Sequence, residues 1–198
     1  QYATSFIRDI NWLWFKVVQN LTPEIENVLI LDHGGHAVTY VPLEILEYYN
    51  VVGIEKTSSG LFDLHEKGSP LFPLIDVANC LAKRHLESPL IAKAVVNKLL
   101  TNFPDFNTKH HHGIVGLGAI GDAITNRLIS MGQKLIVFDV NLELTSQYID
   151  HPQVICTNDI NALVAGSDLI FGCSGRDITQ TSLEQFILSA RDKTLVSC

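Results

Sequence analysis

The sequence has 198 residues, 46% of them hydrophobic, and a formal net charge of −7. A chain of this length can bury one large core or two small ones. The acidic charge and the scattered Lys and Arg residues argue against nucleic acid or an anionic membrane surface as a partner. Apolar runs stay shorter than the roughly 18 residues of a membrane span, so we expect a globular cytoplasmic protein.

The first part of the chain alternates predicted strands and helices. Apolar residues recur at helical spacing from Phe6 to Val18, and Pro23 ends that pattern. The elements that follow are a strand at 28–32, a helix at 42–49, a strand at 51–55, a helix at 60–66 and a strand at 74–77. Such alternation is typical of a small parallel α/β layer.

A long helical pattern at 79–100 comes next. Ser88-Pro89 interrupts it, because Ser can cap a new helix and Pro can occupy its first turn. Further strands are predicted near 112–116, 134–139, 153–156, 168–172 and 194–197. They indicate a second α/β unit whose last strand ends the chain. Since the chain also lacks an initiator Met, we expect a piece of a longer protein, truncated at its C-terminus.

A glycine-rich turn opens the second unit. In Gly116-x-Gly118-x-x-Gly121, the first glycine permits a tight turn, the second lets the backbone approach a pyrophosphate, and the third allows close packing of helix on strand. The N-terminus of the next helix offers N–H groups to phosphates. Asp139 ends the second strand, where its carboxylate would hold ribose hydroxyls and repel a 2′-phosphate. The predicted cofactor is NAD, and its predicted ligands here are Gly116, Gly118, Ala119, Ile120, Gly121 and Asp139.

These patterns predict an α/β fold with two Rossmann-like parallel-sheet units joined by a helical connector. The expected domains are a partial substrate-domain-like α/β unit at 1–78, a helical connector or hinge at 79–110, and a Rossmann NAD-binding domain at 111–198. The sequence contains no internal repeat or low-complexity segment that would indicate a different architecture.

Taken together, the motifs resemble the S-adenosylhomocysteine hydrolase family. Leu29-Ile-Leu-Asp-His-Gly-Gly35 is similar to the family's strand ending in Asp-Asp-Gly-Gly, and Gly53-Ile-Glu-Lys-Thr-Ser-Ser-Gly60 to its Glu-Glu-Thr-Thr-Thr-Gly segment. The stretch 74–87 resembles its Asn-Asp-Ser-Val-Thr-Lys helix. After the dinucleotide unit, Gly172-Cys-Ser-Gly-Arg-Asp177 resembles its Thr-Thr-Thr-Gly-Asn-x-Asp loop. The resemblance covers most of residues 28–198 and none of the helix at 1–20.

The resemblance implies a hydrolase that uses NAD catalytically. In this family NAD takes hydride from C3′ of a nucleoside ribose, the 5′ thioether is eliminated, water adds and the hydride returns. Lys83 falls on the family's catalytic lysine, which helps deprotonate the 3′-hydroxyl, and Glu87 falls on an aspartate beside it. Residues four apart share one helix face, so the pair can reach one hydroxyl. From the residues alone, an ordinary exposed ion pair stays open.

The resemblance also assigns contacts around the cofactor. Thr57, Ser58 and Ser59 fall on the family's hydroxyl-rich contact to the nicotinamide side, although a helix N-cap cluster explains the same residues. Ser174 and Gly175 fall in the loop beside the cofactor. Because the family's C-terminal tail enters a neighbouring protomer's cofactor site, a homo-oligomer is expected, with a nucleoside-type small molecule as substrate.

Departures from the family pattern fall at substrate-facing positions. His33 replaces an aspartate, Lys56 replaces a glutamate that holds ribose hydroxyls, and Glu87 is one methylene longer than the family's residue. A cation cannot accept two ribose O–H groups as a carboxylate does, so adenosine is not expected to bind in the family's manner, and an altered substrate, such as an anionic one, stays open. His33 and Lys56 therefore count as substrate-side candidates.

Two further interpretations stay open. The glycine motif also suits a 2-hydroxyacid dehydrogenase, which would need an Arg for the substrate carboxylate, and Arg176 is the candidate in the cofactor loop. The changes at His33 and Lys56 also fit a non-catalytic NAD-binding homologue. Turnover of a 2-keto acid with NADH would favour the former.

Neither histidine cluster nor cysteine spacing predicts further chemistry. His33-Gly-Gly-His36 and His110-His-His112 lack Cys or carboxylate ligands at a metal-binding spacing, so no metal is expected. The cysteines are widely separated, and free thiols in a reducing cytosol are expected. They are Cys80, Cys156, Cys173 and Cys198. Cys173 lies in the predicted cofactor loop, where it is interpreted as a lining residue rather than a nucleophile.

Overall fold

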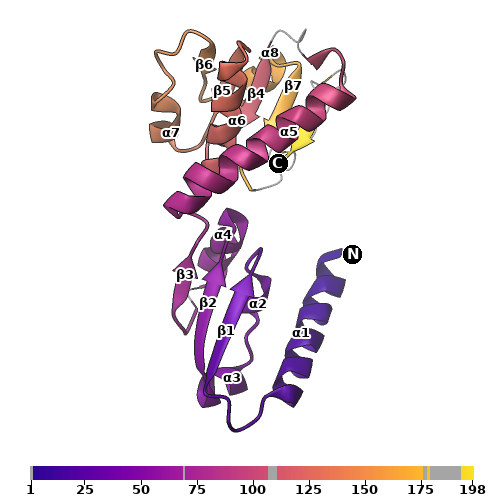
Figure 1. The fold of residues 1–198 in the computed structure, drawn as a ribbon, viewed down its shortest axis with the longest axis vertical. Coiled ribbons are helices and arrows are strands. Elements are labelled where there is room, and N and C mark those ends of the chain that lie inside the picture. The colour runs from indigo at the N-terminus through magenta and orange to yellow at the C-terminus, as the bar shows by residue number, and fades with distance from the viewer. Residues whose placement is uncertain (1, 69, 107–110, 176–177, 179–192) are drawn as a thin grey trace. The chain divides into compact units, whose positions relative to one another are not determined.

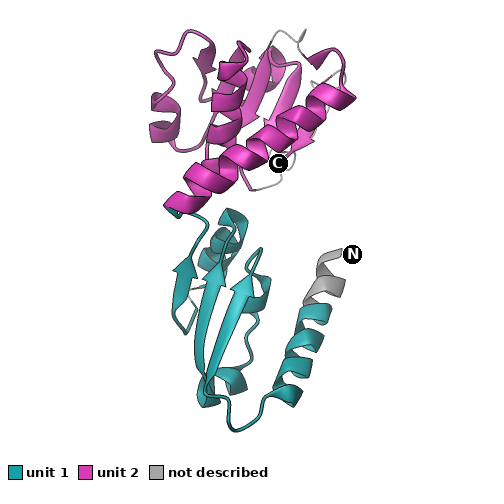
Figure 2. Cartoon of the chain, viewed as in Figure 1, with its two compact units in different colours: residues 1–80 teal, residues 81–198 magenta. Residues whose placement is uncertain are grey.

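The computed structural model describes residues 2–68, 70–106, 111–175, 178 and 193–198 (Figure 1). The chain divides into two compact units, unit 1 at 1–80 and unit 2 at 81–198 (Figure 2). Each unit has its own parallel sheet. The predicted α/β fold with parallel sheets is therefore confirmed.

Unit 1 is a parallel sheet of strand order β1-β2-β3 with helices around it. Its elements are α1 (Tyr2–Asn20), β1 (Asn27–Asp32), α2 (His36–Thr39), α3 (Leu43–Tyr48), β2 (Asn50–Glu55), α4 (Ser58–Lys67) and β3 (Leu74–Asp76). The buried core is made by Trp14, Ile30, Val38, Ile45, Val51 and Leu64. The indole Nε1 of Trp14 donates to the Ala37 carbonyl at 3.1 Å, which fastens α1 to the segment after β1.

Unit 2 is a parallel sheet of strand order β6-β5-β4-β7-β8, covered by helices. Its elements are η1 (Lys83–Glu87), α5 (Ser88–Asn102), β4 (His112–Val115), α6 (Ala119–Ser130), β5 (Leu135–Phe138), α7 (Leu142–Ser146), β6 (Val154–Cys156), α8 (Ile160–Gly166), β7 (Leu169–Gly172) and β8 (Thr194–Ser197). The first strand, β4, lies between β5 and β7, so the chain order reverses at β4. In open α/β sheets, ligands bind at the carboxyl ends of the strands at such a reversal.

The helical stretch before β4 continues through Ser88 rather than breaking there. Ser88 has helical backbone angles, φ −61° and ψ −39°, and its N–H donates to the Lys83 carbonyl, which gives η1 its wider π-helical winding. Pro89 explains the change, because it has no N–H for the His85 carbonyl and its ring crowds that carbonyl. The interruption predicted at Ser88-Pro89 is therefore a local change of winding within a continuous helical stretch. Helix α5 begins at Ser88 with Pro89 in its first turn, and Ser88 is not its N-cap, because its own backbone is helical.

The helix after η1 belongs to the core of unit 2. Ala92, Val96 and Leu99 of α5 are buried in the same cluster as Ile124 and Leu128 of α6. Unit 2 accordingly begins at Leu81. Within the described part of the chain, we find no helix long and apolar enough to cross a membrane.

Candidate functional site

The glycine-rich turn of unit 2 adopts the geometry that its spacing predicts. Gly116 follows β4 with φ +95°, and a β-carbon added there would lie 2.7 Å from the backbone of Ser174. A β-carbon on Gly121 would overlap the Gly116 carbonyl oxygen. Gly118 differs, because a β-carbon there meets no atom within 4 Å. Gly116 and Gly121 are thus required by the fold itself, whereas the space beside Gly118 is open to a ligand.

Helix α6 presents its N-terminus at this open space. Gly118 is its N-cap residue and supplies no side chain to cap the first N–H groups. The first intrahelical bond runs from Asp122 N–H to the Gly118 carbonyl at 2.9 Å. The N–H groups of Ala119, Ile120 and Gly121 come before it, so they have no acceptor within the helix. Such N–H groups, together with the helix dipole, favour a phosphate.

Asp139 lies directly after β5 and faces the glycine turn. One carboxylate oxygen accepts the Leu117 N–H at 2.6 Å, and the other accepts the Asn141 N–H at 2.8 Å. These bonds hold the side chain in one orientation. Since each carboxylate oxygen has two lone pairs, both oxygens keep capacity for ribose hydroxyls. The donor set of the turn, the helix N-terminus and this carboxylate fits a dinucleotide.

The loop after β7 packs against the same turn. The Cys173 N–H donates to the Val115 carbonyl at 2.8 Å, and Ser174 approaches Gly116. Gly175 has φ +69°, a conformation that favours glycine. The predicted loop residues Ser174 and Gly175 therefore lie beside the cofactor turn. Arg176 and Asp177 fall outside the described residues.

In unit 1, a buried carboxylate joins the two motifs that resemble the hydrolase family. Glu55, at the end of β2, is fully buried. It accepts the N–H groups of Gly34 at 3.2 Å, Gly35 at 2.7 Å and Thr57 at 2.7 Å, and the Thr57 hydroxyl at 2.5 Å. Burial alone would raise the pKa of Glu55, but these hydrogen bonds outweigh it and lower the pKa below its usual value.

Two glycines make this arrangement possible. A β-carbon on Gly60 would lie 2.5 Å from the Glu55 carboxyl carbon, and one on Gly35 would lie 2.6 Å from the Gly60 carbonyl oxygen. The motifs at 32–35 and 53–60 are therefore one interlocked structure at the carboxyl ends of β1 and β2. Sequence reasoning did not assign Glu55 this anchoring role. The sequence did contain a signal for this role: Glu55 is an acid at the end of a predicted buried strand, and the glycine pair Gly34-Gly35 follows the other predicted strand.

Thr57 is the N-cap of α4, as one interpretation of its sequence allows. Its hydroxyl accepts the N–H groups of Gly34 at 3.0 Å and Gly60 at 3.1 Å and donates to Glu55. The Ser59 hydroxyl also donates to it, at 3.5 Å, so Thr57 is held by contacts within unit 1. Ser58 is exposed and Ser59 half-buried.

The substrate-side candidates of unit 1 lie at the same sheet edge. His33 and Lys56 are both exposed and directly follow the buried acids Asp32 and Glu55. The Asp32 carboxylate accepts the N–H groups of His33 at 2.7 Å and Val38 at 2.9 Å. The acids thus hold the backbone, while the neighbouring side chains are presented to solvent.

The catalytic candidates lie in unit 2. Lys83 is half-buried and Glu87 exposed, and both belong to η1, which packs against α6. The chain therefore places the amine on an element that adjoins the helix of the glycine turn. A one-turn π-helix of this kind is frequent at functional sites.

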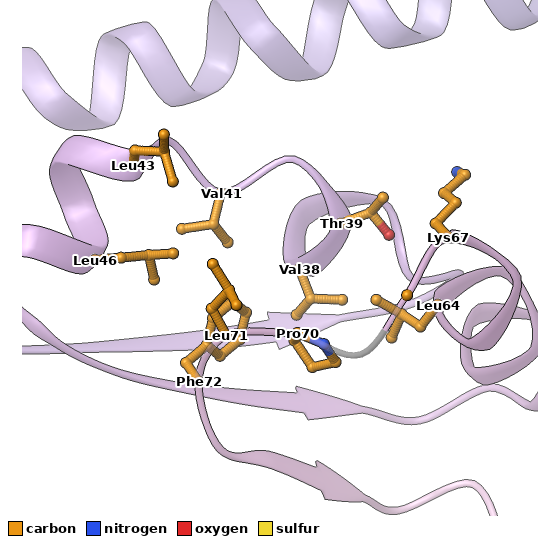
Figure 3. Close-up of a pocket in the computed structure, with 11 residues that line it drawn as sticks. Val38, Thr39, Val41, Leu43, Leu46, Leu64, Lys67, Pro70, Leu71 and Phe72 are labelled. Carbon is orange, nitrogen blue, oxygen red and sulfur yellow. The ribbon is translucent and has the colours of Figure 1, made fainter.

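Figure 3 shows a pocket of unit 1. It has a volume of about 180 Å³ and an apolar lining, including Val38, Leu46, Leu64 and Phe72, with Lys67 at one side. The Lys67 amine lies 5.2 Å from the centre of the Tyr40 ring. No predicted site residue lines this pocket.

Metal ligands do not converge in the part of the chain that the structure describes. There, no three or more His, Cys, Asp or Glu side chains group in a way that could hold an ion. His112 is buried and stacks on Phe106 with ring centres 4.8 Å apart, so it serves the core. His110 lies outside the described residues.

Comparisons with known proteins agree with the geometry of unit 2. Residues 111–190 match the NAD-binding domain family of 6-phosphogluconate dehydrogenase. Over 188 residues, the chain is 29% identical to uncharacterized proteins of Mycobacterium tuberculosis strains CDC 1551 and H37Rv. The match covers 94% of this chain and 34% of those proteins, so the chain spans about a third of the length of these curated relatives.

Two solved structures share the fold. One of the dipicolinate synthase subunits from Bacillus halodurans aligns with a TM-score of 0.52 at 12% identity, covering 78% of this chain and 58% of that one. A 2-hydroxyacid dehydrogenase from Ketogulonicigenium vulgare aligns with a TM-score of 0.50 at 12% identity, covering 85% and 58%. Unit 2 contains an NAD-binding domain of the Rossmann type, and NAD is its cofactor.

Proposed function

We propose that the chain forms part of an NAD-dependent enzyme that oxidises a secondary hydroxyl of a small molecule. The observation that carries the proposal is the packing of η1, which contains Lys83 and Glu87, against α6, the helix that follows the glycine turn. NAD supplies a hydride acceptor when it is bound. The chain must then supply a group that removes the hydroxyl proton, and Lys83 is the candidate.

The finer form of the proposal is an adenosylhomocysteinase-like reaction. Lys83 would take the proton of a nucleoside 3′-hydroxyl, and Glu87, one turn along the same helix, would hold the amine in position and stabilise its protonated form. Ser58 and Ser59 would contact the cofactor, and His33 and Lys56 would lie on the substrate side. The support for this form is the resemblance of the motifs together with the position of η1.

A 2-hydroxyacid dehydrogenase reaction is the second candidate, and Lys56 favours it. Lys56 is exposed where the hydrolase family has a carboxylate, and an ammonium group attracts the carboxylate of a 2-hydroxy acid. The solved structures with this fold include a protein named as a 2-hydroxyacid dehydrogenase. The two candidates share the cofactor and the hydride transfer and differ in substrate.

The test is a pair of measurements on the longest natural form of the protein. NAD binding is titrated by calorimetry. Adenosine is then added to the NAD-bound sample, and absorbance at about 340 nm is followed, because hydride transfer makes NADH. We expect NAD binding and stoichiometric NADH. Consumption of NADH with a 2-keto acid, and none formed with adenosine, would favour the dehydrogenase.

Matched lysine variants show whether Lys83 carries the chemistry. Lys83→Met should keep NAD binding and lose NADH formation, whereas Lys93→Met, on the exposed surface of α5, should behave as the unmodified protein. If NAD binds and neither substrate changes the absorbance, both named reactions are rejected, and the protein is either an enzyme with a different substrate or a non-catalytic NAD-binding homologue.

A further inference from the structure

Two cysteines that are far apart in sequence lie on neighbouring strands beside the NAD turn. Strand β7 pairs in parallel with β8, and Gly172 and Ser197 are the last partners in register. Cys173 and Cys198 directly follow that pair. The Cys198 N–H donates to the Gly172 carbonyl at 3.0 Å, which continues the strand pairing to the cysteines.

The position of the pair suits a covalent bond between the two sulfur atoms. Paired strands lie about 4.8 Å apart, and a disulfide needs a Cα separation of about 4.4–6.8 Å. Partners in register project to the same face of a sheet. Both side chains pack against the same core cluster, and their thiols are hydrogen-bonded to each other. All four cysteines of the chain are free thiols here, so this pair is reduced.

We propose that Cys173 and Cys198 form a disulfide on exposure to hydrogen peroxide, and that this bond weakens NAD binding. The Cys198 sulfur attacks the peroxide oxygen, the O–O bond breaks, and a sulfenic acid and one water form. The Cys173 sulfur then attacks the sulfenic sulfur, and a disulfide and a second water form. Both thiol protons leave in the waters, the sulfurs are oxidised, and one peroxide is reduced.

The order of the two attacks follows from the hydrogen bond between the thiols. Hydrogen bonding to Cys173 lowers the pKa of Cys198 although burial opposes the effect. The same bond, together with burial, raises the pKa of Cys173. Since the thiolate is the reactive form, Cys198 reacts with peroxide first and Cys173 resolves the product.

Contacts of Cys173 connect the disulfide to the cofactor. A β-carbon added to Gly121 would lie 3.2 Å from the Cys173 β-carbon, and one added to Gly116 would lie 2.8 Å from the Cys173 carbonyl carbon. Cys173 therefore touches both glycines that shape the turn. Packed interiors transmit small displacements, so a bond that draws Cys173 toward Cys198 shifts the turn that receives the pyrophosphate.

The experiment compares the peroxide-treated and the dithiothreitol-treated natural protein. Intact mass should fall by two hydrogen masses, and proteolysis should give one linked peptide joining positions 173 and 198. The dissociation constant for NAD should rise about tenfold, the effect of about 1.4 kcal/mol. Dithiothreitol should reverse both changes.

Cysteine variants separate the pair from the other thiols. Cys173→Ser and Cys198→Ser should each prevent the linked peptide and make NAD affinity indifferent to peroxide, while Cys80→Ser and Cys156→Ser should respond as the unmodified protein. Thermal unfolding under reducing conditions checks that each variant is folded, and the NAD affinity of each reduced variant is the reference for its own response to peroxide. Cys173→Ala and Cys198→Ala are used where Ser is not tolerated. A linked peptide that involves Cys80 or Cys156, oxidation of single sulfurs without a link, or a link that leaves NAD affinity unchanged would overturn the proposal.

Discussion

Asp139 combines a structural and a recognition task in one side chain. Its carboxylate already accepts the N–H groups of Leu117 and Asn141, and it is the group that would bind the ribose. Hydrogen bonds to charged groups are each worth about 1.5–3 kcal/mol. Asp139→Ala should therefore raise the NAD dissociation constant by about 10- to 100-fold.

The same variant should also lose discrimination against a 2′-phosphate. Because the repelling charge is gone, NADP affinity should fall less than NAD affinity, or rise. Calorimetric titrations with both nucleotides measure this, with Asp150→Ala, an exposed acid elsewhere in unit 2, as the control. Equal losses for the two nucleotides would show that Asp139 supports the turn without selecting the cofactor.

The hydrogen bonds of Glu55 predict that the stability of the fold depends on pH. Its folded-state pKa is lower than its unfolded value, so its carboxylate stabilises the fold above the unfolded pKa and loses that contribution as pH falls through the folded pKa. Glu55→Gln would turn an amide donor toward the N–H groups of Gly34 or Gly35. We expect a loss of about 2–3 kcal/mol at neutral pH, because buried donors lose their acceptor.

Urea denaturation at neutral pH and at about pH 3 measures this difference. The unmodified protein should lose stability over this interval partly through Glu55, and Glu55→Gln should lose less. Glu44→Gln, on the exposed side of α3, supplies the control. Identical pH profiles for the protein and for Glu55→Gln would contradict the anchoring role.

At the scale of elements, substitutions at Gly121 and Gly118 should affect different properties, the first the stability of the fold and the second the binding of NAD. Gly121→Ala places a methyl group on the Gly116 carbonyl, so α6 must move from β4 and several kcal/mol of stability should be lost. Gly118→Ala has free space and φ −61°, so stability should be unchanged. The methyl group would occupy the space where the pyrophosphate approaches, and NAD binding should therefore fall.

Thermal unfolding and NAD titration of the two variants test this together. The expected pattern is lost stability for Gly121→Ala and lost binding with retained stability for Gly118→Ala. If Gly118→Ala binds NAD normally, the pyrophosphate does not approach the turn at that residue.

The elements around the cofactor site could be predicted from the sequence, because each of them depends on a pattern of only a few neighbouring residues. The strands at β4 and β5, the turn at 116–121 and Asp139 lie where the sequence indicates. The short helices α2, α7 and α8 were not predicted, whereas α3, which is as short and directly follows a proline, was. Contacts between distant segments also escaped prediction. Glu55 meets donors 20 and 21 residues earlier, and Cys173 meets Cys198 only through strand pairing.

At the scale of the whole molecule, the two units have separate cores, so NAD should change their unfolding temperatures by different amounts. Every residue of the turn and Asp139 belongs to unit 2, while both tryptophans, Trp12 and Trp14, belong to α1 of unit 1. Trp14 is buried and hydrogen-bonded to Ala37, so its fluorescence reports unfolding of unit 1. A ligand at 100 times its dissociation constant stabilises the state that binds it by about 2.7 kcal/mol.

We therefore expect NAD to raise the unfolding temperature of unit 2 and to shift the transition reported by tryptophan less, because unit 1 would add only the proposed contacts of Ser58 and Ser59. Calorimetry follows both transitions, and fluorescence follows unit 1 alone. Asp139→Ala serves as the control, because the shift of unit 2 should shrink with the loss of affinity. A tryptophan transition that moves by the same amount would show that the two units unfold as one, since NAD bound to residues of unit 2 would then stabilise the core around Trp14.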